Sequence, residues 1–182
     1  MAPQAMASPL DAITPPACRT DAQGELVIDP GTRNDVELIT ALHKPAQALA
    51  KLDEACQDQG PKARQAMKNL YQQFVQYAQA VTQTFPPDEQ IAIPVEKLEA
   101  VLLKGLHDLR VQYFGAETAC AMYCEEEELT RRMLAVAVDY KQKNPKASTE
   151  ESVGMAQAEI MKEIEAKEAA AAAARGEAPA QR

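Results

Sequence analysis

The feature that most constrains the fold is an apolar stripe with helical spacing over residues 62–84. Large apolar side chains recur there every three or four residues, and glutamines occupy the opposite side. Such an amphipathic helix buries one face and leaves the other in water. The segment therefore predicts a long helix that other apolar elements must cover, through Met67, Leu70, Tyr71, Phe74, Tyr77, Ala78, Val81 and Phe85.

Similar stripes occur on both sides of this segment, and prolines separate them. Asn34 is placed to cap a first helix, which Pro45 breaks near Lys44. Gly60 and Pro61 then end this part of the chain and begin the next helix. The predicted helices cover 34–59 with a break at Pro45, 62–84, 95–114 and 116–143. In 95–114 the residues expected to face inward are Leu98, Leu102, Leu106, Leu109 and Tyr113. In 116–143 they are Ala119, Met122, Leu129, Met133, Val136, Ala137 and Tyr140.

Composition supports helices over sheets. Hydrophobic residues make up 46% of the chain, but only 4% of residues are counted as aromatic and tryptophan is absent. Alanine, leucine and methionine favour helices, whereas strands are enriched in aromatic and β-branched residues. We expect an all-α fold, a small helical bundle of four or five helices with a disordered N-terminal leader and a projecting C-terminal helix. The predicted boundaries are 1–33 for the leader, 34–146 for the bundle and 147–182 for the charged, alanine-rich C-terminal helix and tail.

A short extended segment at 25–28 interrupts the proline-rich leader. Leu26, Val27 and Ile28 form a β-prone run that the sequence Asp29-Pro30-Gly31 closes with a turn signal. A lone strand cannot satisfy its own backbone hydrogen bonds, so it either adds to a partner's sheet edge or lies as a loop against the helices. The first alternative makes the three apolar residues candidate partner contacts.

The last predicted helix opens with a capping-box pattern at Ser148 and Glu151 and ends in six alanines at 169–174. Its apolar stripe is thin, because Val153, Ile160 and Ile164 are its main large side chains. The helix either projects and meets a second copy or a partner helix through this seam, or docks loosely and frays after about Glu168. In the first case Val153, Ile160 and Ile164 are candidate partner contacts.

Two cysteines, Cys120 and Cys124, lie one helical turn apart on the same predicted face. They could share a metal ion with two further ligands, but no second cysteine or histidine pair exists. A disulfide within the helix is disfavoured, since β-carbons at this spacing lie about 5–6 Å apart and a bridge prefers about 3.8 Å. We expect both to behave as small apolar residues and all four cysteines to be reduced thiols.

No group of residues suggests catalysis. The glutamates after Cys124 are expected to form Glu127–Arg131 and Glu128–Arg132 pairs on a solvated face. His107 is expected at the margin of a buried face as a structural residue. The seven glycines are scattered, so they form no phosphate-binding loop. The sequence therefore predicts a protein that is not an enzyme and holds no cofactor.

Charge and hydropathy limit the partners. With 27 acidic and 19 basic residues the net charge is −8 and the isoelectric point is near 4.9, which disfavours nucleic acid without a local basic patch. No stretch reaches the roughly 20 apolar residues of a membrane span, and the N-terminus lacks a signal-peptide pattern. We expect a cytoplasmic protein with neither nucleic acid nor membrane as partner.

The leading hypothesis is a non-catalytic protein–protein interaction protein: an adaptor, a chaperone-like factor or a structural subunit of a larger bacterial or phage assembly. It would bind a protein partner or self-associate through its termini. One alternative is a thiol-dependent metal or redox protein using Cys120 and Cys124. Another is an acidic inhibitor that mimics nucleic acid, although residues 35–84 carry five acidic and five basic side chains and are neutral overall.

Overall fold

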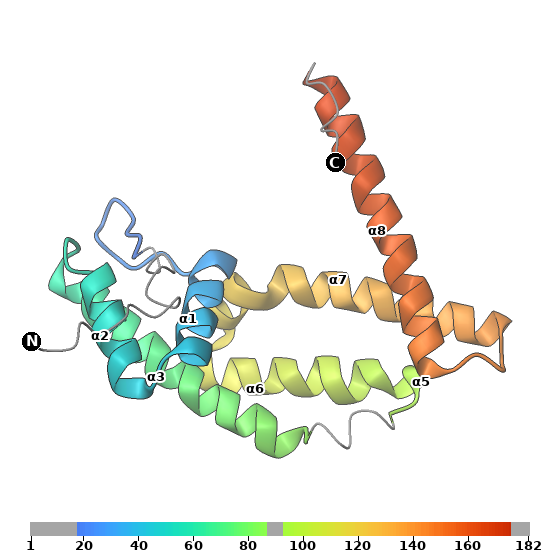
Figure 1. Cartoon of the computed structure of the whole chain (residues 1–182), viewed down its shortest axis with the longest axis horizontal. Helices are drawn as coiled ribbons and strands as arrows, with labels where there is room; N and C mark the ends of the chain where they lie inside the picture. Colours follow the sequence, from blue (N-terminus) through green and yellow to red (C-terminus); the bar gives the residue numbers. More distant parts are fainter. Residues whose placement is uncertain (1–17, 87–92, 176–182) are drawn as a thin grey trace, which may run out of the picture. The chain divides into compact units, whose positions relative to one another are not determined.

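The structure, a computed structural model, describes residues 18–86 and 93–175 and confirms the all-α fold. No helix in these ranges combines the length and the apolar content that a membrane crossing requires. The elements are α1 (Pro30–Leu42), α2 (Pro45–Ala55), α3 (Pro61–Thr84), α5 (Val95–Leu98), the π-helical turn η2 (Glu99–Leu103), α6 (Lys104–Phe114), α7 (Ala116–Lys143) and α8 (Thr149–Ala174), as Figure 1 shows.

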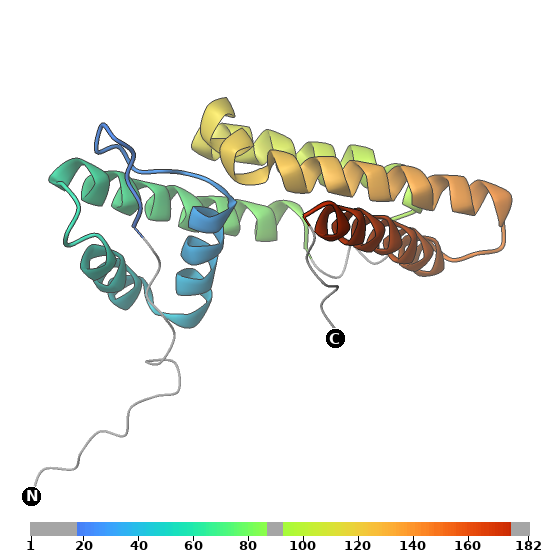
Figure 2. The same cartoon turned by 90° about the horizontal axis from the view of Figure 1, so that it is seen from above.

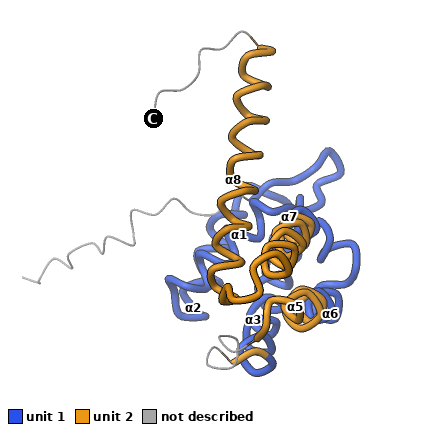
Figure 3. The backbone as a smooth tube through the Cα atoms, turned by 90° about the vertical axis from the view of Figure 1, so that its right-hand side faces the viewer, with its two compact units in different colours: residues 1–84, 107–125 blue, residues 85–106, 126–182 orange. Residues whose placement is uncertain are grey.

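The chain divides into two compact units, which Figure 3 colours separately. Unit 1 comprises residues 1–84 and 107–125, and unit 2 comprises residues 85–106 and 126–182. Helices α6 and α7, which Figures 1 and 2 show, each contribute residues to both units.

Aromatic side chains from α3, α6 and α7 form the centre of the unit 1 core. The ring of Tyr77 lies 5.2 Å from that of Phe114 and 6.1 Å from that of Tyr123, between centroids. Such pairs contribute about 0.5–1.5 kcal/mol beyond the burial of their area. Helices α1 and α2 cover the same stripe of α3, and the remaining buried side chains include Val36, Ile39, Ala48, Leu52, Met67 and Leu70.

The core of unit 2 is smaller and contains Val95 and Leu98 of α5, Leu134 and Ala137 of α7, and Ala156 of α8. The two alanines are fully buried, so the helix backbones approach closely at these positions. Gly105 serves a similar purpose in α6, because a β-carbon there would lie 2.6 Å from the Phe85 ring. Small residues therefore allow the short distances between the packed segments of this unit.

Several predicted helix ends are confirmed. Pro45 and Pro61 each begin a helix, where the missing N–H of proline leaves no hydrogen bond unsatisfied. Gly115 ends α6 with a positive φ of 80°, a conformation that glycine adopts without steric cost. Ser148 caps α8 by accepting a hydrogen bond from the backbone N–H of Glu151 at 3.0 Å.

The start of the first helix was predicted wrongly. Its N-cap is Asp29, not Asn34, and Pro30 and Gly31 form its first turn, not a turn between elements. The Asp29 carboxylate accepts hydrogen bonds from the Thr32 backbone N–H at 2.9 Å and from Arg19 at 2.6 Å. An aspartate followed by proline is an N-terminal signal as good as an isolated asparagine, so the helix begins earlier.

The predicted disordered leader of residues 1–33 is wrong for residues 18–33; its first 17 residues lie outside the described part. The backbone N–H of Val27 donates to the Arg19 carbonyl at 2.8 Å, next to an antiparallel bridge between Thr20 and Leu26. Leu26 and Ile28 pack against the unit 1 core. The predicted extended segment 25–28 therefore pairs within its own chain and lies against the helices.

The π-helical turn shifts the buried face of α6. The Lys104 backbone N–H donates to the Glu99 carbonyl, a five-residue step that inserts one extra residue into the helix. One extra residue rotates everything after it by about 100°. The most buried positions of this segment are therefore Leu103, Arg110 and Phe114, one residue further along than expected. Of the expected residues, Leu102, Leu109 and Tyr113 are half-buried and pack against the cores, and Leu106 is half-buried.

Asp29 makes the stability of unit 1 depend on pH. Arg19 and the Thr32 N–H lower the pKa of the Asp29 carboxyl to about 2. Its ionised form therefore stabilises the fold fully above about pH 4, the ordinary range of an aspartate, and this contribution disappears as the pH falls towards 2. We expect Asp29→Ala to lower the free energy of unfolding by about 0.5–2 kcal/mol at pH 7, as for other lost caps.

Urea unfolding of both Asp29→Ala and Asp29→Asn checks this expectation. Asparagine caps helices as well as aspartate, so Asp29→Asn keeps the cap and removes only the charge. It should lose less stability at pH 7 and show a weaker pH dependence between about pH 2 and 4. Equal losses in the two variants would contradict the assigned cap.

Candidate functional site

The structure joins Cys120 and Cys124 in a disulfide on the N-terminal turns of α7, with their Cα atoms 4.6 Å apart. The expectation that a disulfide is disfavoured within this helix is therefore wrong. Four residues of a regular α-helix rise about 6 Å, so the helix is locally compressed between the two cysteines. Cys120 is exposed and Cys124 is half-buried.

The other two cysteines are also oxidised, which overturns the expectation of four reduced thiols. Cys18 and Cys56 form a second disulfide across 38 residues of sequence, and no cysteine of the chain is free. Both are buried, with exposed fractions of 8% and 0%. This bridge fastens the segment before α1 to the end of α2, where Thr20 also donates to Gln59 at 2.8 Å.

A buried arginine and two tyrosines form the most unusual side-chain cluster in unit 1. The Arg110 guanidinium carbon lies 4.0 Å from the Tyr123 ring centroid, and its Nε donates to the Tyr77 hydroxyl at 3.3 Å. Arg33 approaches the same Tyr123 ring at 5.0 Å. Cations over an aromatic face are attracted by its negative potential, more strongly where water is excluded.

Tyr123 combines deep burial with an unsatisfied hydroxyl. Its exposed fraction is 2%, and its Oη has no hydrogen-bond partner within residues 18–86 and 93–175. Burial raises the pKa of Tyr123, so the phenol stays protonated and cannot act as a base near neutral pH. The cluster therefore fits a structural role, in which guanidinium groups pack on an aromatic ring.

Sequence reasoning missed both Arg110 and Tyr123. Arg110 was missed because the π-helical turn rotates α6 by one residue. Tyr123 was missed because only its neighbour Met122 was predicted to be buried. The buried face of α7 is wider than expected and includes both residues. A different signal could have revealed it: residues 119, 123, 127, 134 and 137 share a helical spacing that passes through the glutamate run.

The glutamate run is not a uniformly solvated face. Glu127 has an exposed fraction of only 6%. Arg131 pairs with Glu128 at 2.6 Å, and Arg132 reaches Glu163 of α8 at 2.5 Å. The predicted pairing of Glu128 with Arg132 is therefore replaced by a contact between helices, and Leu129, predicted inward, is exposed.

The predicted partner-contact residues are used largely within the chain. Leu26 and Ile28 pack on the unit 1 core and Val27 is half-buried beside them. Val153 packs against the unit 2 core, and Ile160 is 5% exposed. Ile164, the next large apolar residue of the α8 stripe after Ile160, is half-buried. Nothing brings the N-terminal set and the α8 set into one site.

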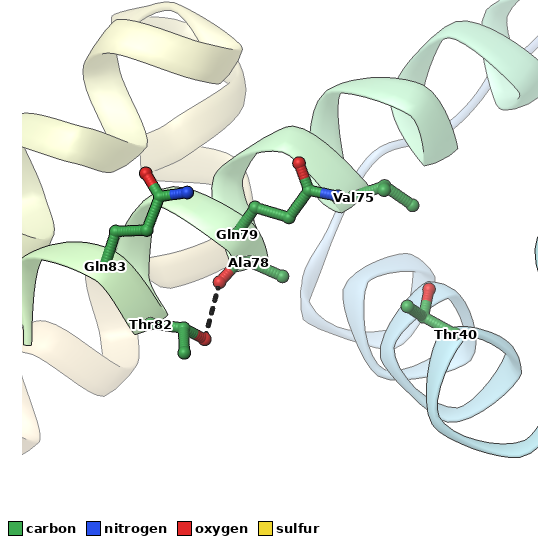
Figure 4. Close-up of a pocket in the computed structure, with 6 residues that line it drawn as sticks. All are labelled: Thr40, Val75, Ala78, Gln79, Thr82 and Gln83. Atoms are coloured by element: carbon green, nitrogen blue, oxygen red, sulfur yellow. Dashed lines mark hydrogen bonds between the residues drawn. The ribbon is translucent and has the colours of Figure 1, made fainter. Parts of the chain in front are cut away.

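A surface groove of about 400 Å³ lies between α1 and α3. Figure 4 shows its lining, with Thr40 on α1 and Val75, Ala78, Gln79, Thr82 and Gln83 on α3. The Thr82 hydroxyl donates a hydrogen bond to the Ala78 carbonyl of its own helix at 3.0 Å. The groove thus offers amides and methyl groups, and its six described lining residues include no charged side chain.

The described lining of the groove includes no histidine and no carboxylate. His107, expected at the margin of a buried face, is exposed, and His43 forms the C-terminal end of α1. Among the described residues, no three side chains of the histidine, cysteine, aspartate and glutamate types are placed to hold a metal ion. The expectation that the protein holds no cofactor stays a prediction.

The unpaired Tyr123 hydroxyl allows a direct test of the structural role proposed for this cluster. We expect Tyr123→Phe to leave the free energy of unfolding unchanged or to raise it by up to about 1 kcal/mol, because it removes a buried polar group without a partner. Tyr123→Ala should cost about 3–5 kcal/mol through the cavity it leaves. Urea unfolding measures both, and a marked loss in Tyr123→Phe would show that the hydroxyl is bonded in solution.

Comparison with known proteins gave no match to a family model, to a curated protein or to a solved structure. The residues of the chain are therefore the basis on which its function is inferred.

Proposed function

We propose that the protein is a non-catalytic protein–protein interaction protein whose helix α8 binds a helix of a partner. One observation carries this proposal: α8 continues to Ala174, although in residues 161–174 only Ile164 and Ala172 are even half-buried. A helix of this length without tertiary contacts is marginally stable in water. A partner helix would supply the missing contacts.

The two halves of α8 differ in their surroundings. Its first half is anchored in unit 2, where Ser152, Ala156 and Ile160 are buried and Glu163 pairs with Arg132. Beyond Glu163 the helix extends for 11 residues to Ala174, about 16 Å at the usual rise. Figure 1 shows these turns leaving the helices α5 and α7 of the same unit.

The chemistry of the free half suits a helical partner. Met161 is 48% exposed, and methionine adapts its flexible side chain to varied partner surfaces. The alanines at 169–174 permit close approach of a second backbone, and the mixed lysines and glutamates before them favour a partner of mixed charge. The occupant would be a second copy of the chain or a different protein, consistent with an adaptor, a chaperone-like factor or an assembly subunit.

A metal site at the cysteine pair and a nucleic-acid mimic have less support. A metal site at Cys120 and Cys124 needs two free thiolates, whereas the pair is oxidised. A nucleic-acid mimic needs rows of unpaired carboxylates, yet Asp53 is held by Arg64 and Lys68 at 2.7 and 2.8 Å. These two cations lower the pKa of Asp53 to about 2. The carboxylates of Glu25, Asp29, Glu128 and Glu163 are likewise paired with cations.

The remaining expectations stay predictions: no catalytic activity, no nucleic acid, no membrane and a cytoplasmic location. The disulfides weigh against the last of these. Disulfides persist in oxidising compartments and are reduced in most cytosols, so two of them in one chain favour a secreted or periplasmic setting. Cell fractionation followed by blotting would decide between the two locations.

Deleting the free half of α8 tests the proposal. We expect a chain ending at Ile164 and the variant Met161→Glu to lose association with the partner by about tenfold or more, as for contact residues that carry binding energy. Light scattering after size-exclusion chromatography measures self-association. Affinity capture from the native cell, with identification of the bound protein, covers a different partner.

Leu38→Glu is the matched control. Leu38 on α1 is also exposed, at 44%, and its substitution introduces the same charge outside α8. It should retain the mass and the partners of the unmodified chain. The proposal fails if the shortened chain and Met161→Glu keep both the same mass and the same bound proteins.

A further inference from the structure

We propose that Cys120–Cys124 is an exchangeable disulfide that reacts with thiol reductants in the folded protein, whereas Cys18–Cys56 is structural. This inference does not depend on the partner of α8. It assigns to the N-terminal turns of α7 a redox site whose co-reactant is a small dithiol. The argument starts from the difference in access between the two bridges.

Access separates the two bridges. Thiol–disulfide exchange requires a thiolate to approach one sulfur atom, so its rate depends on exposure. Cys120 is exposed and Cys124 half-buried on the surface of α7. Cys18 and Cys56 are 8% and 0% exposed and lie in the unit 1 core. A reductant can reach Cys120 in the folded chain but must wait for local opening to reach Cys56.

The consequences of breaking each bridge also differ. Cys18–Cys56 spans 38 residues, so its loss releases a long loop and the contacts of the segment before α1. Cys120–Cys124 spans four residues within one continuous helix, whose backbone hydrogen bonds do not need the bridge. Unit 1 can therefore remain folded while this pair cycles between its two states.

The exchange is a transfer of two electrons and two protons. A thiolate of the dithiol attacks Sγ of Cys120, the more exposed residue of the pair, and a mixed disulfide forms as the Cys124 thiolate leaves and takes up a proton. The second thiolate of the same dithiol molecule then attacks the dithiol sulfur that is bonded to Cys120. The Cys120 thiolate leaves and takes up a proton. The dithiol ends as a cyclic disulfide, and the protein ends with two thiols.

The pair is placed to affect the core. Met122 and Tyr123 lie between the two cysteines in sequence, and both are buried in unit 1. The oxidised pair holds its Cα atoms at 4.6 Å, whereas the reduced pair is free to adopt the spacing of about 6 Å found in a regular helix. Reduction therefore acts directly on the turn that presents the Tyr123 ring to Arg110 and Arg33.

Timed alkylation of the full chain tests the proposal. The protein, purified without reductant, is treated with dithiothreitol under native conditions, quenched, alkylated and mapped by mass spectrometry. We expect Cys120 and Cys124 to become alkylated about tenfold or more faster than Cys18 and Cys56. In guanidinium the rates should become about equal, since unfolding exposes all four sulfurs.

The double variant Cys120→Ser, Cys124→Ser is the control, and it should lose the fast phase and keep the slow one. Equal rates in the native protein, or faster reaction of Cys18 and Cys56, would overturn the proposal. So would a rate difference that persists in guanidinium, because it would then arise from local sequence and not from exposure. Four free thiols in the protein as purified would also end it.

Discussion

The structure of unit 1 depends on the ring of Tyr77, where three helices from two separate parts of the sequence meet. Its centroid lies 5.2–6.4 Å from those of Phe74, Tyr113, Phe114 and Tyr123. The chain has eight aromatic side chains of the phenylalanine and tyrosine types and no tryptophan, and five of them gather here. With so few large side chains available, concentrating them around one residue is what allows the stripe of α3 to be covered by residues 107–125.

The same cluster explains how a cation can be buried in a small core. Arg110 is only 6% exposed, and removing its charge from water is costly unless other groups compensate. The Tyr123 ring and the Tyr77 hydroxyl supply part of that compensation. Because Tyr123 lies between Cys120 and Cys124 in sequence, the proposed redox site and the buried cluster share one turn of α7.

Much of the secondary structure could be predicted, because proline, glycine and capping residues act locally. Pro45, Pro61 and Gly115 mark helix ends whatever packs around them, and Ser148 with Glu151 forms a cap from neighbouring atoms alone. The errors have local causes too. Asp29 before Pro30 was interpreted as a turn, and the π-helical turn before Lys104 leaves no simple mark in the sequence.

The candidate site was predicted less well. The cysteine pair was recognised as the feature to explain, but its oxidation was rejected on the geometry of an undistorted helix. Arg110 was not recognised at all, and Glu127 was placed on the solvated side. The first two depend on a small displacement of a helix from regular geometry, and a periodic pattern assumes that no such displacement occurs. Glu127 instead follows the regular spacing of the buried face of α7 and was misplaced because of its charge.

The sequence by itself determined that the chain is helical, where most helices begin and end, and that α8 has too few large apolar residues to be buried along its length. These properties follow from hydrogen bonding and side-chain preference within a few residues. Only the tertiary structure decided that Cys18 meets Cys56, that residues 18–29 fold against the helices, and that Arg110 faces Tyr123. Such pairs form because distant segments compete for the same apolar surface, and that competition is settled in space, not along the chain.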